Sequence, residues 1–172
     1  KKWLKVLTLV GIILPATLFW ILRFNHASFL EKFPDDDIYV QEQVGLHLKE
    51  ISHPDEKIFV WGFATGIYFH SKLKPMSRFL WSDLLTGRTP GPAYARVDQD
   101  KEGSYSNPEA WQAFWQDVRQ KAPDYFIDTS AANIHDYGRF PVQNYPRLAA
   151  YLQQNYDKIE AVQGVLIYRL KK

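Results

Sequence analysis

WLKVLTLVGIILPATLFWIL, residues 3–22, is the stretch that decides how the rest of the chain is organised. No residue from Val6 to Leu22 is charged. As an α-helix this run would be roughly 26 Å long, close to the thickness of the hydrocarbon core of a bilayer. Trp3 and Trp20 lie near its two ends, where indole rings favour the headgroup region. The stretch therefore predicts a transmembrane helix.

Two other interpretations of this stretch remain open. A cleaved signal peptide would end at a pair of small residues, and Ala27-Ser28 is the one candidate site that follows the apolar run. A buried helix of a soluble protein would carry a polar stripe, whereas this run has only Thr8 and Thr17. We favour the membrane span over both.

The charges on either side of the span predict its orientation. Lys1, Lys2 and Lys5 precede the uncharged run that begins at Val6, whereas Arg23 alone directly follows it, so the positive-inside rule places the N-terminus in the cytoplasm. Residues 23–36 then form a linker at the membrane surface, and residues 37–172 form an extracytoplasmic domain on the inner (cytoplasmic) membrane. Because the first residue is Lys1 rather than Met, we expect further sequence to precede it.

Composition restricts the function classes of this domain. All 19 acidic residues lie beyond Leu30, and removing the four basic residues that precede Leu30 from the total of 21 leaves 17, a net charge of −2. A nucleic-acid-binding domain should be basic, so we expect no nucleic-acid partner. The absence of cysteine excludes disulfides, thiolate metal ligands and a cysteine nucleophile.

Apolar periodicity and turn residues predict an alternation of helices and strands after the linker. Helices are expected after Asp35-Asp36-Asp37, after Gly62, from Asn107-Pro108 and from Tyr145-Pro146. Strands are expected at Lys57–Trp61, Arg78–Trp81, Asp124–Thr129, and in a hairpin of Asp157–Val162 and Val165–Leu170 around Gln163-Gly164. This order predicts an α/β fold: a three-layer sandwich with a mainly parallel, Rossmann-like sheet and a C-terminal antiparallel hairpin, preceded by one transmembrane helix.

Several residues are candidates for a site. Gly62 and Asp128 end two predicted strands, and ligands of open α/β sheets bind beyond the carboxyl ends of their strands, although a structural role for Asp128 is favoured. The long segment Asp83–Asn107 is the preferred contact surface, because long loops in compact domains tend to be functional. Trp111 and Trp115 lie on one helical face; they suit stacking on a sugar, but we favour packing in the core.

Two groups of polar residues that could suggest a metal or catalytic site are not assigned one. The run of aspartates at residues 35–37 is read as a helix N-terminus rather than a cation site, since carboxylates cap free amides there. His135 and Asp136 are neighbours in sequence and seldom point at one target, so they do not support a metal site or an acid–base pair. No nucleophile elbow, P-loop or zinc-protease motif is present.

A succession of short motifs resembles the C-terminal end of bacterial GT-C glycosyltransferases, the dolichyl-phosphate-mannose mannosyltransferase-like and aminoarabinose-transferase-like proteins. In these proteins a last membrane helix leads into a small extracytoplasmic α/β domain. The resemblance covers most of the chain. It is carried by Ile58–Gly62, Ile67–Phe69, Pro75 with Arg78-Phe79, Pro123–Asp128, Tyr145–Leu148 with Tyr151-Leu152, and Val165–Arg169.

The resemblance implies a glycosyltransferase with a polyprenyl-phosphate sugar donor, whose catalytic Asp lies in a first outer loop, commonly with a divalent metal. Neither that loop nor that Asp is in this chain, so no catalytic residue, metal ligand or cofactor is assigned to it. The domain is expected to cover or shape the acceptor side of the active site, against the membrane and the rest of the membrane domain. The residues expected to bind lipid-linked sugar or glycan acceptor are Trp61, Gly62, Tyr68, Arg78, Arg88 and Asp128.

Two alternatives are kept. One is a single-span, membrane-anchored interaction module that carries out no chemistry. The other is an anchored hydrolase using Asp128 and His135, which predicts turnover by the domain alone. For Trp61 and Tyr68, core packing is favoured over ligand contact.

Overall fold

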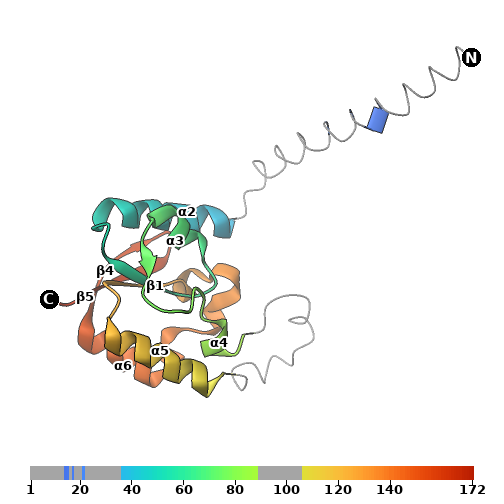
Figure 1. Ribbon diagram of the computed structural model, residues 1–172. Helices are drawn as coiled ribbons and strands as arrows, with labels where there is room; N and C mark the ends of the chain where they lie inside the picture. Colours follow the sequence, from blue (N-terminus) through green and yellow to red (C-terminus); the bar gives the residue numbers. More distant parts are fainter. Residues whose placement is uncertain (1–13, 16, 18–20, 22–35, 89–105) are drawn as a thin grey trace, which may run out of the picture. The chain divides into compact units, whose positions relative to one another are not determined.

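A computed structural model describes residues 14, 15, 17, 21, 36–88 and 106–172. The chain divides into two compact units, Lys1–Asp36 and Asp37–Lys172, and the sheet belongs to the second. The elements of this unit enclose one sheet between two sets of helices (Figure 1).

The sheet has five strands in the order β2-β1-β3-β5-β4. Its strands are β1 (Lys57–Trp61), β2 (Lys74–Pro75), β3 (Tyr125–Asp128), β4 (Tyr156–Val162) and β5 (Val165–Leu170). β1 pairs in parallel with β2 and β3, whereas β5 runs antiparallel to both β3 and β4. The β4–β5 turn is formed by Gln163 and Gly164, both with positive φ (49° and 81°), as a two-residue hairpin turn requires.

Helices cover both faces of the sheet (Figure 1). α2 (Asp36–Ile51) and α3 (Gly66–Ser71) lie on one face, and α5 (Pro108–Gln120) and α6 (Pro146–Asn155) lie on the other. Because side chains alternate along a strand, β1 contributes to two cores. Ile58 and Val60 pack in the α2/α3 core, whereas Phe59 and Trp61 pack in the α5/α6 core.

Shorter elements connect these layers. The four-residue helix α4 (Asp83–Thr86) follows the β2 segment, and three 3₁₀ turns separate β3 from α6. These turns are η3 (Ser130–Ala132), η4 (Ile134–Arg139) and η5 (Val142–Asn144). α5 begins as the sequence predicts, with Pro108 in the first turn and the Asn107 side chain accepting hydrogen bonds from the Glu109 and Ala110 amides.

The prediction that the strands of the sheet run mainly parallel is wrong. A mainly parallel, Rossmann-like sheet was expected, but most paired residues belong to the antiparallel ladders of β5 with β3 and β4. The hairpin lies beside the three parallel strands, as expected, with β5 rather than β4 directly next to β3. The predicted strand Arg78–Trp81 is also irregular, and the second strand is the two-residue β2 instead.

The predicted transmembrane helix is a further correction to the fold class. Among residues 14, 15, 17, 21, 36–88 and 106–172, the structure contains no helix that is both long and apolar enough to cross a membrane. Within the predicted span 3–22, only residues 14, 15, 17 and 21 are described, and these are helical. The rest of the span, and the linker as far as residue 35, lie outside the described residues.

Candidate functional site

Trp61 and Tyr68, predicted at the site, are buried parts of the core. The Trp61 indole N–H donates to the Phe140 carbonyl at 2.8 Å. The Tyr68 hydroxyl accepts from the Val60 amide at 3.0 Å. Burial raises the pKa of Tyr68, and that hydrogen bond offsets only part of the rise. Both polar atoms are thus bonded within the fold.

Gly62 and Asp128 lie where parallel strands β1 and β3 end. A Cβ on Gly62 would meet Thr129 Oγ1 at 1.9 Å, and its φ of 144° suits glycine, so the two strand ends approach too closely for a side chain. The Asp128 carboxylate accepts from the Ser130 amide (2.9 Å) and hydroxyl (2.6 Å). Burial raises the pKa of Asp128, although these hydrogen bonds counteract part of the rise. The structure gives both residues roles in a buried turn.

Arg78 lies against α5 rather than at the strand ends. Its Nη2 donates to Asp117 Oδ1 at 2.7 Å, its Nε lies 3.1 Å from Asp117 Oδ2, and its main-chain amide donates to the same oxygen. Burial raises the pKa of Asp117, but the hydrogen bonds from Arg78 and Ser77 outweigh it and bring the pKa below its usual value. The bonds between Arg78 and Asp117 therefore link the segment after β2 to α5.

Arg88 belongs to a buried polar cluster next to the 3₁₀ turns. Its guanidinium lies 3.4 Å from Asp83 and donates to the His135 carbonyl at 3.0 Å. Asp83 also accepts from the Tyr137 hydroxyl at 2.9 Å. Burial raises the pKa of Asp83, and Tyr137 and Arg88 offset part of this rise.

The carboxylate beside His135 is Asp37, not Asp128 as the hydrolase hypothesis requires. Asp37 Oδ2 lies 3.1 Å from His135 Nδ1 and also accepts the His135 amide at 2.8 Å. His135 Nε2 lies 3.3 Å from the side-chain nitrogen of Gln41. Both ring nitrogens are therefore occupied by protein groups, which suits a structural histidine better than a general base. Within residues 36–88 and 106–172, no three His, Asp or Glu side chains are grouped so as to hold a metal ion.

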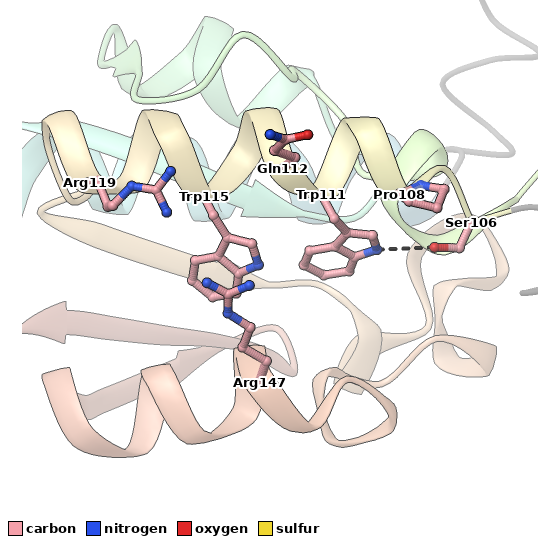
Figure 2. A pocket seen from close by; sticks show the side chains of 7 residues that line it. All are labelled: Ser106, Pro108, Trp111, Gln112, Trp115, Arg119 and Arg147. Atoms are coloured by element: carbon pink, nitrogen blue, oxygen red, sulfur yellow. Dashed lines mark hydrogen bonds between the residues drawn. The ribbon is translucent and has the colours of Figure 1, made fainter.

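An open depression lies instead between α5 and α6. It has a volume of about 420 Å³, within the roughly 300–1,000 Å³ range of small-molecule sites. Figure 2 shows its lining: most side chains project from α5, and Arg147 reaches across from α6. The lining residues are Ser106, Pro108, Trp111, Gln112, Trp115, Arg119 and Arg147. A second depression of about 370 Å³ shares Trp115, Arg119 and Arg147 with the first, so the two form one feature, named here the α5–α6 groove.

The floor of the α5–α6 groove consists of two indole rings held in place by stacking and by hydrogen bonds. Trp111 and Trp115 stack at 6.3 Å with an interplanar angle of 24°. The Trp111 N–H donates to the Leu85 carbonyl (2.9 Å) and lies 3.1 Å from Ser106 Oγ, the bond drawn in Figure 2. Trp61 lies 6.1 Å behind Trp111. The groove thus has a rigid aromatic surface with little conformational entropy to lose on binding.

Positive charge lines one end of the α5–α6 groove. The Arg147 guanidinium lies 4.3 Å above the centroid of the Trp115 ring, and Arg119 follows Trp115 by one helical turn. Both arginines are exposed, and neither forms an ion pair with any residue that the structure describes. No residue of either lining set is acidic. An aromatic floor beside free guanidinium groups can bind a planar or ring-shaped ligand that carries negative charge.

The α5–α6 groove contains none of the six predicted site residues. The aromatic stripe on α5 was recognised in the sequence, but its partners Arg119 and Arg147 were not. Arg119 could have been found from its i+4 spacing to Trp115. Arg147 could not, because its position over Trp115 depends on how α6 packs against α5.

No family model, curated protein or solved structure matches the chain.

Proposed function

We propose that this chain is the C-terminal, extracytoplasmic part of a bacterial membrane glycosyltransferase that uses a polyprenyl-phosphate sugar donor. In this proposal the domain of residues 37–172 is not catalytic. It binds a saccharide on the acceptor side of the active site, and the groups that transfer the sugar belong to another part of the same protein. The motif resemblance supports the enzyme class, and the α5–α6 groove supports the role of the domain.

The observation that carries the proposal is the Trp111 indole in the α5–α6 groove, since Trp115 beside it is buried and lies under Arg147. Trp111 is only partly buried although it packs against the core, and its N–H is already satisfied by Leu85 and Ser106. Its remaining accessible surface is therefore apolar. Sugar rings stack on such surfaces through their C–H faces. Gln112 and Ser106 on the same wall supply polar groups for sugar hydroxyls.

Saturation-transfer NMR on the purified chain, with a panel of short neutral and acidic oligosaccharides, tests this function. We expect transfer from aromatic protons to sugar ring protons, and we expect Trp111→Leu to abolish it. Trp81→Leu is the matched control, because Trp81 is 41 % exposed but does not line the α5–α6 groove. Thermal melts of both variants check that they fold. Absence of transfer to any member of the panel, or equal loss in both variants, would contradict the proposal.

A second candidate function, a non-enzymatic interaction module, is favoured by a different surface. Leu80 and Trp81 on the segment that joins β2 to α4, and Leu84 in α4 itself, are 41–54 % exposed. Adjacent exposed apolar side chains are typical of protein contact sites. This alternative predicts no saccharide signal in the NMR experiment, and it predicts that Trp81→Leu, rather than Trp111→Leu, removes partner binding.

A further inference from the structure

We propose that the α5–α6 groove is selective for a negatively charged saccharide, one that carries a carboxylate or a phosphate on its ring. This inference rests on the saccharide binding proposed above and adds the charge of the ligand. It depends on how the two arginines are held relative to the indoles.

Arg147 is oriented by the ring below it. When a guanidinium stacks on an indole, its N–H groups point outward in its own plane, parallel to the ring. They therefore remain available for hydrogen bonds. The Cζ–centroid distance of 4.3 Å to Trp115 matches such a stack. Arg147 is thus held beside the groove with its donors free to bind a carboxylate or phosphate in a bidentate manner.

Arg119 approaches the same end from the opposite helix. Figure 2 shows the Arg147 guanidinium at the Trp115 ring and Arg119 farther along α5, whereas Ser106 and Pro108 lie toward the other end, beyond Trp111. The groove is therefore polarised along its length. A ligand with its ring against Trp111 would place an anionic substituent between the two guanidinium groups.

The wider charge distribution makes this positive site specific to the groove. Residues 37–172 carry 16 basic and 16 acidic residues, so the domain as a whole has no net charge to attract anions. Several other arginines of this domain are neutralised, as Arg78 is by Asp117, Arg88 by Asp83 and Arg169 by Glu56. Arg119 and Arg147 have no such partner among residues 36–88 and 106–172.

The test is a titration of the purified chain, followed by tryptophan fluorescence or calorimetry, with glucose, glucuronate, glucose 6-phosphate and inorganic phosphate. We expect at least one acidic sugar to bind about tenfold more tightly than glucose, as a charge-assisted hydrogen bond implies. That affinity should fall as salt rises. Glucuronate and glucose 6-phosphate distinguish a carboxylate-bearing from a phosphate-bearing ligand, and inorganic phosphate measures the contribution of the anion alone.

Arg119→Gln and Arg147→Gln should each weaken binding of the acidic sugar about five- to tenfold and weaken glucose binding by a smaller factor, because glucose offers the guanidinium groups no anion. Lys49→Gln is the matched control, because it removes one positive charge from exposed α2 on the opposite face of the sheet and should change affinity less than twofold. All three side chains are exposed, so none of these variants should affect folding.

The outcomes separate the two proposals. If glucose binds as tightly as both acidic sugars, or if the arginine variants keep full affinity, charge selectivity is refuted while saccharide binding stands. If inorganic phosphate binds as tightly as glucose 6-phosphate, the ring contributes nothing and this inference is refuted. If no sugar binds at all, both proposals fail.

Discussion

Replacing Asp117 should show how firmly α5, the main wall of the α5–α6 groove, is fastened to the rest of the fold. Asp117 is 9 % exposed and accepts the Ser77 hydroxyl at 3.0 Å and the Arg78 amide at 3.1 Å. Each hydrogen bond to a charged acceptor contributes about 1.5–3 kcal/mol. The Arg78 side chain is 56 % exposed and can return to water, so we assign its ion pair no stabilisation. From the two remaining bonds we expect Asp117→Ala to lower the free energy of unfolding by about 3 kcal/mol.

Urea denaturation at pH 7, followed by tryptophan fluorescence, measures this change. A loss of about 3 kcal/mol leaves a domain of ordinary stability folded, so the full transition should remain visible. Asp157→Ala is the matched control, since its carboxylate is 71 % exposed and lies 3.9 Å from Lys171. We expect this control to cost less than about 0.5 kcal/mol. A loss under about 0.5 kcal/mol for Asp117→Ala, or equal losses in both variants, would refute the reasoning.

The pH dependence of the same pair gives an independent check. The pKa of Asp117 is lower in the folded protein than in the unfolded chain, where it is about 3.9. The folded state therefore favours the carboxylate, and this stabilisation is present above the unfolded pKa and lost as the pH falls through the folded pKa. The difference in stability between wild type and Asp117→Asn should shrink as the pH is lowered from 6 toward the folded pKa. A difference that is constant over this range would contradict the assigned direction.

Three further changes test other parts of the fold. Gly62→Ala should lower the free energy of unfolding by about 2–4 kcal/mol, because the new Cβ meets Thr129 Oγ1. In urea titrations this loss should be at least about 1 kcal/mol smaller in a Thr129→Ala background. Tyr137→Phe removes the hydroxyl donor of buried Asp83 and should cost about 1–3 kcal/mol by the same measurement; an unchanged midpoint would mean that Asp83 is satisfied without it. Burial raises the pKa of Asp128, so the folded state favours its protonated form and stability falls as the pH rises through that raised pKa. Asp128→Asn should remove this fall in stability. In melting curves at pH 4 and pH 7, the melting temperature of the variant relative to wild type should therefore be higher at pH 7 than at pH 4.

Elements fixed by local chemistry could be predicted from the sequence. Asn107-Pro108-Glu109 predicts the start of α5, because the cap, the fixed proline φ and the acidic first turn all act within a few residues. Gln163-Gly164 likewise predicts the β4–β5 hairpin, since the turn determines the pairing of the strands beside it. Both predictions are confirmed.

Elements that depend on distant partners could not be predicted. Arg78–Trp81 has the apolar content of a strand, but the Arg78 amide bonds to the Asp117 side chain rather than to a neighbouring strand. Similarly, no local pattern specifies that β5 inserts between β3 and β4. This insertion is the reason that the sheet is not mainly parallel.

The same distinction explains why the predicted site and the proposed site differ. Ligands of open α/β sheets bind where parallel strands end, and the sequence reasoning followed that rule. Here β1 and β3 are the central parallel pair, but their ends are filled by protein groups: Gly62 abuts Thr129, and Asp128 binds Ser130. The α5–α6 groove lies away from these strand ends: there the partly buried Trp111 lies beside exposed Arg119 and Arg147, an arrangement that depends on how α5 packs against α6.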